Sequence, residues 1–340
     1  MKPIRFAIVG TNFISDLFCD AVRRTPGCEI GAIYSRSDTS GTAFAAKNGL
    51  TVPVFTDYGT MLSADLDAVY IASPHFCHME QSIAAMAAGK HVLVEKSAAL
   101  NAAQFSAMKE AAEKHHVVLC EAMRPWFDPS LRVIRESLGR CGKLRHARFE
   151  FCQYSSRYDR FLGGEVLNAF DPSLSNCALL DIGIYCAANA LYLFGAPADV
   201  TARSVFLHNG FEAGGTATLL YDGFTAELCY SKVFQSDCLC RIDGEEGSVT
   251  YTLPSVPHGA VFSKRVGRDH KEEKIPLPIV ENNMVYELAA FCSFAAGDGD
   301  ESREKSEIGA AESLALTSET ISLLDRIRGS AGIDLPGVRD

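Results

Sequence analysis

The segment His91-Val-Leu-Val-Glu-Lys-Ser-Ala-Ala-Leu-Asn101 joins a short, mostly apolar strand to the start of a helix. Residues 91–94 predict a buried strand that delivers two charged side chains, Glu95 and Lys96, at its carboxyl end. In an open parallel sheet, ligands bind beyond the carboxyl ends of the strands. The two side chains are therefore either part of a ligand site or a solvent-exposed ion pair, and this segment alone does not decide between them.

Strand-like and helix-like patterns alternate on both sides of this segment. Helical patterns extend to residues 24 and 48 and cover residues 74–88 and 102–115. The expected strands are residues 4–9, 29–34, 52–55, 68–72, 91–94 and 117–120. Six strands alternating with helices predict an α/β fold, an N-terminal Rossmann domain with a doubly wound parallel sheet. We place this dinucleotide-binding domain at residues 1–121.

The turn Gly10-Thr-Asn-Phe-Ile-Ser15 occupies the place of a G-x-G-x-x-G motif between the first strand and the first helix. Only Gly10 is kept; we expect Asn12 in the left-handed conformation and Ser15 to allow close helix–strand packing. Backbone amides at such a helix N-terminus would face a pyrophosphate. The alternative is an ordinary strand–helix turn.

The end of the second strand, Ile33-Tyr-Ser-Arg-Ser37, bears on the choice of dinucleotide. An acidic residue here would accept the adenosine ribose hydroxyls, whereas an Arg accommodates a 2′-phosphate. No acidic residue occurs before Asp38, and Arg36 is flanked by Ser35 and Ser37, which can donate hydrogen bonds. The sequence favours NADP(H) over NAD, the alternative being a solvated surface Arg.

The segment Ser73-Pro-His-Phe-Cys-His78 begins the next helix. We predict Ser73 as its N-cap and Pro74 in its first turn. His75 and His78 are three residues apart on one helical face, close to where a nicotinamide would lie. No third ligand is evident, so we expect no metal centre.

Composition excludes several classes of function. A net charge of −10 argues against a nucleic-acid or anionic membrane surface. The start MKPIRFAIVG lacks a signal-peptide pattern, and the most apolar long segment, residues 178–196, contains Asp181 and Asn189 and predicts a buried helix instead of a membrane span. The twelve cysteines form no zinc-like spacing, so we expect free thiols and a reducing, cytoplasmic location.

The pattern changes in the second half, which we treat as a second domain, residues 122–340. Alternating runs at residues 143–153, 199–207, 216–221, 225–231, 238–242 and 248–252 predict a large, mostly antiparallel open sheet with helices on one face. Residues 153–171 are rich in Tyr, Arg, Phe and Gly and predict an arm that closes over the substrate. Helices at residues 283–296 and 306–328, separated by a polar loop at 297–302, end the chain; they belong to this α+β domain or pack back on the first.

These motifs together resemble the Gfo/Idh/MocA family of NAD(P)-dependent oxidoreductases over nearly the whole chain. The glycine turn, Ser73-Pro74 with His78, and Glu95-Lys96 match, although Ser97 replaces the proline of the family's Glu-Lys-Pro. In Leu180-Asp-Ile-Gly-Ile-Tyr185, Tyr185 takes the place of the histidine in the family's Asp-x-Gly-x-His. The same replacement occurs in the branch of dimeric dihydrodiol dehydrogenases and related sugar dehydrogenases.

The resemblance implies a role for each matching residue. Residues near the nicotinamide would include Ser73, Pro74, His75 and His78, with Glu95 on its ribose and Lys96 beside the reacting carbon. Arg36 would bind the adenosine phosphate. Arg124 and Trp126, from Glu121-Ala-Met-Arg-Pro-Trp, are candidates for substrate or phosphate contact, or else form a domain hinge with a packing Trp. The pyrophosphate would be cradled by Gly10, Thr11, Asn12, Phe13 and Ile14.

The expected chemistry is hydride transfer between the nicotinamide and a sugar, polyol or dihydrodiol-type alcohol or carbonyl. The alkoxide formed by carbonyl reduction needs a proton, and a Tyr phenol with an unperturbed pKa of about 10 needs a nearby cation to supply it. We therefore expect Tyr185 to exchange the proton and Lys96 to polarise the oxygen. Asp181, four residues before Tyr185 on the same helical face, would accept a substrate hydroxyl.

Two other functions fit the same fold. A dinucleotide-sensing regulator would not need to keep both Glu95 and Lys96, and an NAD-dependent glycosidase of this fold is disfavoured by Arg36. The open face of the second sheet, together with the family resemblance, predicts a homodimer or a dimer of dimers.

Overall fold

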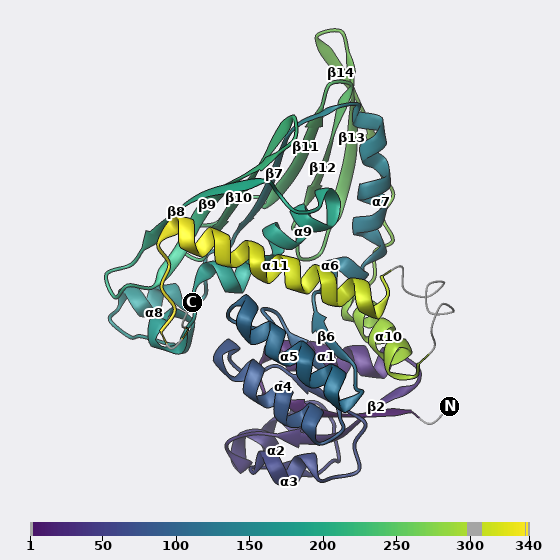
Figure 1. Ribbon diagram of the computed structural model, residues 1–340, viewed down its shortest axis with the longest axis vertical. Coiled ribbons are helices and arrows are strands. Elements are labelled where there is room, and N and C mark those ends of the chain that lie inside the picture. Colours follow the sequence, from purple (N-terminus) through teal and green to yellow (C-terminus); the bar gives the residue numbers. More distant parts are fainter. Residues whose placement is uncertain (1–2, 298–307, 337, 339–340) are drawn as a thin grey trace. The chain divides into compact units, whose positions relative to one another are not determined.

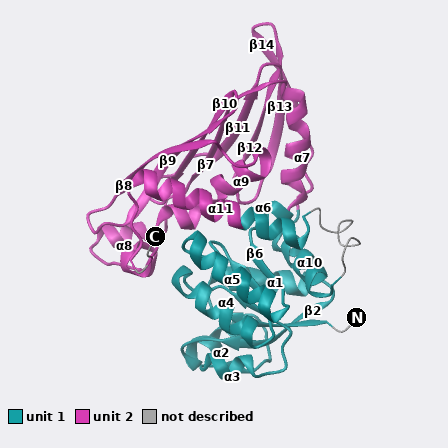
Figure 2. Cartoon of the chain, in the orientation of Figure 1, with its two compact units in different colours: residues 1–127, 280–317 teal, residues 128–279, 318–340 magenta. Residues whose placement is uncertain are grey.

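The computed structural model describes residues 3–297, 308–336 and 338, which fall into two compact units (Figure 2). Unit 1 comprises Met1–Phe127 and Val280–Thr317, and unit 2 comprises Asp128–Ile279 and Ser318–Asp340. The chain leaves unit 1 after Phe127 and not after residue 121. Strand β6, Leu119–Ala122, is followed by helix α6, Arg124–Phe127, and this helix packs on helix α10, Met284–Ala295, of the same unit. Unit 2 thus begins six residues after the expected boundary, and residues 280–317 return to unit 1, the arrangement given above as the alternative for the C-terminal helices.

Unit 1 is built on a six-stranded parallel sheet with the order β3-β2-β1-β4-β5-β6, which confirms the predicted doubly wound topology. The order reverses between β1 and β4, which places the connecting helices on both faces. The central strands are buried on both sides, which explains their almost continuous apolar sequences. The strands are β1 Ile4–Val9, β2 Cys28–Tyr34, β3 Val54–Phe55, β4 Ala68–Ile71, β5 His91–Glu95 and β6 Leu119–Ala122.

Side-chain caps fix where several of the unit 1 helices begin. Helix α5 begins where the sequence predicts, and the side chain of Asn101 accepts a hydrogen bond of 2.9 Å from the Gln104 amide there. Asn12, Ser37 and Asp57 cap α1, α2 and α3 in the same way. The short α3 was not expected. The helices are α1 Phe13–Arg24, α2 Asp38–Lys47, α3 Tyr58–Leu62, η1 His75–Cys77, α4 His78–Ala87, α5 Ala102–His115, α6 and α10 Met284–Ala295.

Strand β6 begins two residues later than the predicted start at 117. His116 ends α5 in the left-handed conformation, with a φ of 54°, and the amide of Val117 still donates to the Ala112 carbonyl of that helix at 3.1 Å. Residue 117 therefore completes the helix end, whereas the carbonyl of Val118 already accepts the Val92 amide of β5 at 2.8 Å.

Unit 2 contains an eight-stranded sheet with the order β14-β13-β12-β11-β7-β10-β9-β8 (Figure 1). All of its neighbouring strands run antiparallel except β7 and β10, so the predicted mostly antiparallel sheet is confirmed. The sequence did not reveal β13 and β14; every residue of β14 is exposed, so it lacks the alternation of a half-buried strand. The strands are β7 Leu144–Cys152, β8 Asp199–Phe206, β9 Glu212–Tyr221, β10 Phe224–Ser231, β11 Leu239–Gly244, β12 Gly247–Thr252, β13 His258–Val266 and β14 Asp269–Lys274.

One face of this sheet is covered by helix α9, Ile184–Phe194, and by the π-helical turn η5, Leu179–Gly183, that precedes it. Inward side chains such as Ala147, Phe149 and Ile242 are fully buried beneath them. The long helix α11, Ala310–Ala331, runs from unit 1 into unit 2. The remaining helical segments are α7 Pro129–Ser137, η2 Leu138–Cys141, α8 Tyr158–Leu162, η3 Asn168–Phe170 and η4 Pro172–Leu174.

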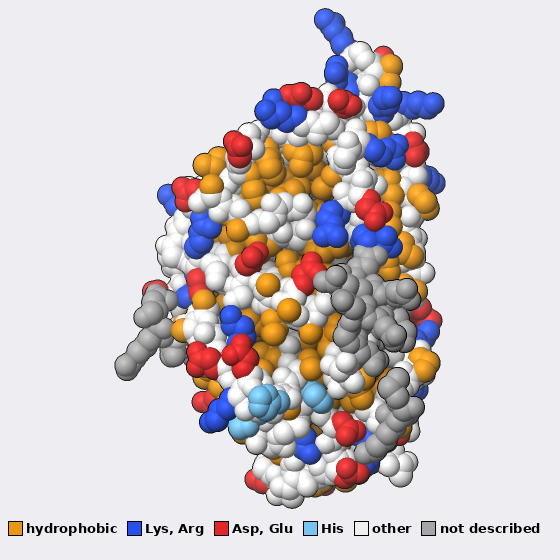
Figure 3. All heavy atoms as spheres, turned by 45° about the vertical axis from the view of Figure 1, so that its right-hand side comes forward, with side chains coloured by type: hydrophobic (Ala, Val, Ile, Leu, Met, Phe, Trp, Pro, Cys, Tyr) orange, Lys and Arg blue, Asp and Glu red, His pale blue; other side chains and the backbone are white. Residues whose placement is uncertain are grey.

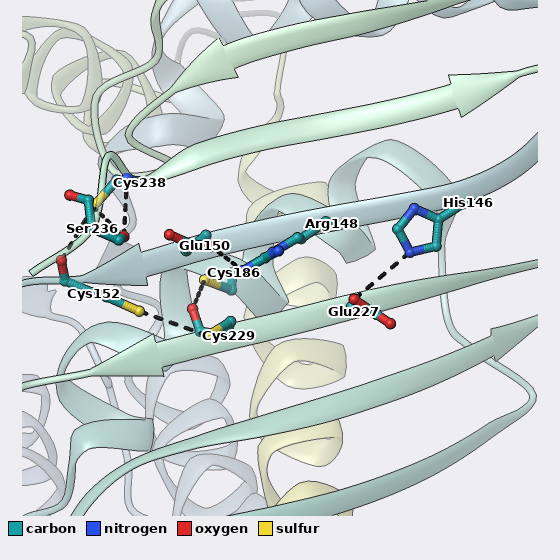
Figure 4. A network of polar contacts seen from close by, with 9 residues as sticks. All are labelled: His146, Arg148, Glu150, Cys152, Cys186, Glu227, Cys229, Ser236 and Cys238. Atoms are coloured by element: carbon teal, nitrogen blue, oxygen red, sulfur yellow. Dashed lines mark hydrogen bonds and ion pairs between the residues drawn. The ribbon is translucent and has the colours of Figure 1, made fainter. Parts of the chain in front are cut away.

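The opposite face of the sheet carries a polar network on the parallel strands β7 and β10 (Figure 4). Arg148 pairs with Glu150, and the sulfur atoms of Cys152 and Cys229 lie 3.7 Å apart. Leu220 of β9 and Leu239 of β11 face the same way with 49% and 45% of their surface exposed. This face, called the open face below, thus mixes charged and apolar side chains.

The surface view in Figure 3 shows a similar mixture, with continuous areas of hydrophobic side chains bordered by charged ones. Among the described residues, no helix combines the length and apolar character that crossing a bilayer requires. Residues 298–302 of the expected polar loop lie outside the described residues.

Candidate active site

Gly10 ends β1 at a point where only glycine fits. Its φ is +103°, and a Cβ there would lie 2.6 Å from the Ala72 carbonyl oxygen at the end of β4. Ser15 is fully buried and donates from its hydroxyl to the Gly10 carbonyl at 2.9 Å, which confirms the expected close helix–strand contact. The turn is therefore held tightly against two neighbouring strand ends.

Asn12 does not adopt the left-handed conformation that we expected. Its φ of −93° and ψ of −179° are extended, and its side chain caps α1 by accepting the amides of Ile14 and Ser15 at 3.1 and 3.3 Å. The Asn12 amide group also donates to the Ala72 carbonyl at 2.9 Å. Capping favours extended backbone, and this is why Asn replaces glycine here without strain.

The turn leaves room for a phosphate group at the N-terminus of α1. Gly10 has no side chain, Thr11 is half-buried, and Asn12 and Phe13 are exposed, Phe13 at 70%. Backbone amides and the helix dipole at this position favour an anion. The residues present thus fit the pyrophosphate of a dinucleotide.

Ser35 and Arg36 follow β2 at the same edge of the sheet. Ser35 is buried, its amide donates to the Phe55 carbonyl at 3.0 Å, and its hydroxyl accepts the Ser37 amide at 3.4 Å. Arg36 is exposed, which keeps its guanidinium accessible to a ligand. These contacts hold the backbone on both sides of Arg36.

Ser73 is not the N-cap that we predicted. The helical turn η1 begins at His75 with Pro74 in the cap position and without a side-chain cap, while the Ser73 hydroxyl donates to Gln81 at 2.6 Å. The extended backbone of Pro74, with a ψ of 146°, inserts one residue between Ser73 and the first turn and so takes the hydroxyl away from its amides. Pro74 is exposed and His75 half-buried.

His78 is fully buried and links two segments of the site. Its Nδ1 lies 2.8 Å from the Ser97 carbonyl oxygen and its Nε2 lies 2.8 Å from the Ser73 carbonyl oxygen. Burial lowers the pKa of His78. Both ring nitrogens are engaged within the protein, so His78 holds the residues around the site and does not present a nitrogen to a ligand.

Glu95 and Lys96 end β5 in different environments. Glu95 is buried and accepts a hydrogen bond of 2.6 Å from the Tyr70 hydroxyl, and burial raises the pKa of its carboxyl. Lys96 is half-buried, and its peptide bond to Ser97 is cis. Ser97, at the position of the expected proline, is fixed by its carbonyl contact with His78 and by a 2.7 Å hydrogen bond from its hydroxyl to the Ala99 carbonyl.

Glu121 is a buried residue of this site that the sequence analysis missed. It lies on β6 beside β5, and its Oε1 accepts a 2.8 Å hydrogen bond from the Ala98 amide, two residues after Lys96. Burial, with a smaller contribution from the nearby Glu95, raises the pKa of the Glu121 carboxyl to about 7, although the hydrogen bond from Ala98 and the charge of Lys96 lower it. This role depends on the contact between Glu121 and Ala98, which are 23 residues apart, so no local pattern could have shown it.

Arg124 opens helix α6 and is held by the returning segment of unit 1. Its Nε and Nη2 both donate to Asn283 Oδ1, at 2.9 and 2.5 Å. Trp126 is buried, which supports the packing alternative for this residue. Arg124 is half-buried and keeps a fixed guanidinium among the buried carboxyl groups of unit 1.

In unit 2, Asp181 and Tyr185 do not lie on one regular α-helix as expected. Residues Leu179–Gly183 form a π-helical turn, a local form that often marks functional sites. A buried carboxyl of Glu212 accepts the Leu179 amide at 3.0 Å, and a Cβ on Gly183 would lie 2.9 Å from the Tyr230 ring. These two constraints fix the turn against β9 and β10.

The two side chains differ in their surroundings. Tyr185 is buried, and its ring centroid lies 5.7 Å from that of Phe151. Asp181 keeps 34% of its side chain exposed, and its Oδ2 lies 2.8 Å from Nζ of Lys232, a buried residue that the sequence analysis did not identify. Unit 2 therefore offers a partly exposed carboxylate and, one turn along, a phenol.

The geometry of unit 1 defines a dinucleotide-binding α/β unit, with a phosphate turn after its first strand and an anchored lysine after its fifth. A family model described as "Oxidoreductase family, NAD-binding Rossmann fold" matches residues 4–123, and one described as "GFO/IDH/MocA C-terminal domain" matches residues 134–250. The chain belongs to the Gfo/Idh/MocA family of oxidoreductases.

Two relatives and one solved structure illustrate the similarity. A scyllo-inositol 2-dehydrogenase (NADP(+)) of Bacillus subtilis is 39% identical over 98% of both chains. The trans-1,2-dihydrobenzene-1,2-diol dehydrogenase of Homo sapiens is 28% identical, also over 98% of both. The structure of a 3-ketoreductase from Actinomadura kijaniata with NADP and TDP-benzene covers 97% of this chain and 98% of its own, with a TM-score of 0.83 and 23% identity. The protein is thus an oxidoreductase with the fold of this family.

The Glu121 carboxyl gives the stability of unit 1 a defined pH dependence. Its pKa rises from 4.5 to about 7 on folding, so its contribution to stability is fully present below pH 4.5 and is lost as the pH rises through 7. Glu121→Gln keeps an oxygen for the Ala98 amide and cannot ionise. Between about pH 5 and 8, we expect the free energy of unfolding of the variant to rise by up to about 3 kcal/mol relative to that of the wild type.

Chemical denaturation at a series of pH values measures this difference, with Glu113→Gln on the exposed side of α5 as the control. A difference in the free energy of unfolding that stays constant over this range would contradict the assignment.

Proposed function

We propose that the protein is an NADP-dependent dehydrogenase or reductase that transfers a hydride between the cofactor and a sugar, polyol or dihydrodiol-type substrate. The observation that carries the proposal is the anchoring of Lys96. Contacts of 2.8 Å from His78 to Ser97 and from Ala98 to Glu121 fix the backbone directly after it, at the carboxyl end of β5. A surface ion pair would not need such support. The name of the 39% identical relative, a polyol dehydrogenase that uses NADP(+), points to the same chemistry.

The cofactor would be held by groups at the carboxyl edge of the unit 1 sheet. Arg36, exposed after β2, would bind the 2′-phosphate with Ser35 behind it, and residues 10–14 would bind the pyrophosphate. Ser73, Pro74 and His75 would line the nicotinamide half. The Glu95 carboxyl is occupied by Tyr70, so we assign Glu95 to shaping the ribose site together with Arg124.

The bound nicotinamide would supply the site that gives or takes the hydride. The ammonium of Lys96 polarises the substrate oxygen as its charge develops. The phenol of Tyr185 exchanges the proton with that oxygen, and the carboxylate of Asp181 accepts a hydrogen bond from a neighbouring substrate hydroxyl. The three residues thus meet three different needs of the reaction: Lys96 provides the cation, Tyr185 the proton and Asp181 the hydroxyl acceptor.

We also propose a cytoplasmic location and a homodimer formed through the open face. The free cysteines among the described residues support a reducing compartment. The exposed Leu220 and Leu239, with Arg148 and Glu150 between them, support a self-complementary interface on this sheet.

Lys96→Ala tests the catalytic assignment. With a panel of sugars and polyols and NADP followed by absorbance, we expect the variant to lose about 100-fold or more in kcat while its Kd for NADP changes only a few-fold, because Lys96 acts on the reacting oxygen. Lys114→Ala, an exposed lysine of α5, is the control.

Near-normal turnover by Lys96→Ala would contradict this role. NADP binding by the wild type without turnover of any substrate in the panel would favour a sensing function. Glycoside cleavage without a net change in nicotinamide absorbance would favour a glycosidase.

Arg36→Ala tests the cofactor assignment. Removing a charge-assisted contact with the 2′-phosphate should raise the KM for NADP by about 10- to 100-fold and leave the KM for NAD nearly unchanged. Arg23→Ala, an exposed arginine of α1, should affect neither constant. An equal change for both cofactors would exclude recognition of the 2′-phosphate by Arg36.

Leu239→Asp tests the dimer. A charge on the open face should shift the sedimentation coefficient from that of two chains to that of one. Val266→Asp, which alters a somewhat more exposed apolar residue of β13, should leave it unchanged. A dimer that withstands Leu239→Asp would place the interface elsewhere.

A further inference from the structure

Lys232 is a cation buried beside the proposed substrate-binding carboxylate. It directly follows β10, and only 5% of its surface is exposed. Its Nζ lies 2.8 Å from Asp181 Oδ2 and donates to the Ala169 carbonyl at 3.0 Å. A buried ammonium is tolerated only where partners replace its water, and here the partners come from two separate segments.

The second of these segments is the arm, residues 153–171. The Lys232 ammonium lies 5.3 Å from the ring centroid of Phe170 in the arm and 5.4 Å from that of Phe211, distances suited to cation–π attraction. Phe170, Ala169 and Phe161 of the arm pack with Phe211 and Ala213 in one buried cluster. The charged end of Lys232 therefore lies between this cluster and Asp181.

The backbone of Lys232 is fixed as well. Its amide donates to the Ala213 carbonyl at 2.8 Å, and its carbonyl accepts the Ser155 amide, at the start of the arm, at 2.9 Å. The side chain thus meets the arm near its end while the backbone meets it near its beginning. Both ends of the arm therefore contact Lys232, the residue that follows β10.

We propose that Lys232 is a positioning residue that orients the Asp181 carboxylate toward a substrate hydroxyl and joins it to the arm, so that the two respond to substrate as one unit. The substrate part of this inference rests on the proposed function, whereas the joining of arm and carboxylate does not. Lys232 itself touches neither substrate nor cofactor in this assignment. Its effect on specificity passes through Asp181.

Lys232→Met separates these roles from a general structural one. A third of the Asp181 side chain, 34%, is exposed, so water can solvate the carboxylate once the ammonium is removed, and the fold should survive. Met fills the stem volume without the charge. Lys232→Arg keeps the cation and should restore most of the wild-type behaviour, and Lys274→Met, an exposed residue of β14, is the matched control.

The first readout is limited digestion with trypsin at Arg157 and Arg160, both exposed in the arm. Lys232→Met should be cleaved there at least tenfold faster than the wild type, while the control is cleaved at the wild-type rate. Cleavage within twofold of the wild type would overturn the joining of Lys232 to the arm.

The second readout is kinetic. For a polyol turned over by the wild type, Lys232→Met should raise KM about tenfold with less than a threefold change in kcat. It should also lower the ratio of kcat/KM for this polyol to kcat/KM for the analogue that lacks one hydroxyl. In an Asp181→Asn background the same substitution should change neither constant further. An undiminished effect in that background would overturn action through Asp181.

Failure of the proposed function is recognised separately. If the wild type turns over none of the sugars and polyols, the function is wrong, and the cleavage rates alone then decide whether Lys232 holds the arm.

Discussion

The hydrogen bond from the Ala98 amide to the buried Glu121 carboxyl fixes the chain directly after Lys96. A strand that ends at the edge of a sheet leaves its next amides and carbonyls without partners, and burial makes each unpaired group costly. In unit 1, Glu121 satisfies one such amide and His78 meets the carbonyl of Ser97. Lys96 can remain half-buried beside this loop because the backbone around it does not depend on water.

Unit 2 follows the same physical rule with different residues. The Glu212 carboxyl accepts the Leu179 amide at the beginning of the π-helical turn, and Lys232 pairs with Asp181 within it. In both units, a segment with proposed catalytic side chains is fixed by buried ionisable groups, Glu121 in unit 1 and Glu212 and Lys232 in unit 2, that are distant in sequence. Such contacts fix the backbone that carries a functional side chain more firmly than solvent alone can.

Local sequence was sufficient for the features that depend on local physics. The apolar runs predicted the parallel sheet, and the start and end of α5 were predicted at residues 102 and 115 because the helical pattern involves only neighbouring residues. Glu121 and Lys232 escaped notice because their partners lie far away in sequence or on other strands. The π-helical turn was missed because the apolar periodicity of residues 178–196 does not mark it, and the close approach of Gly183 to Tyr230 depends on a distant residue. For the same reason the return of residues 280–317 to unit 1 was given only as an alternative.

That return has a consequence for how the chain is made. Phe291 of α10 is fully buried, and its ring centroid lies 5.6 Å from that of Phe6 in β1. During synthesis, residues 1–127 leave the ribosome long before α10 does, and translation proceeds at roughly 5–20 residues per second. Because β7 to β14 are translated before α10, the apolar surface around Phe6 lacks its cover by α10 until all of these strands have been made. Unit 1 is thus started first, yet Asp128–Ile279, the larger part of unit 2, is translated before unit 1 can be completed.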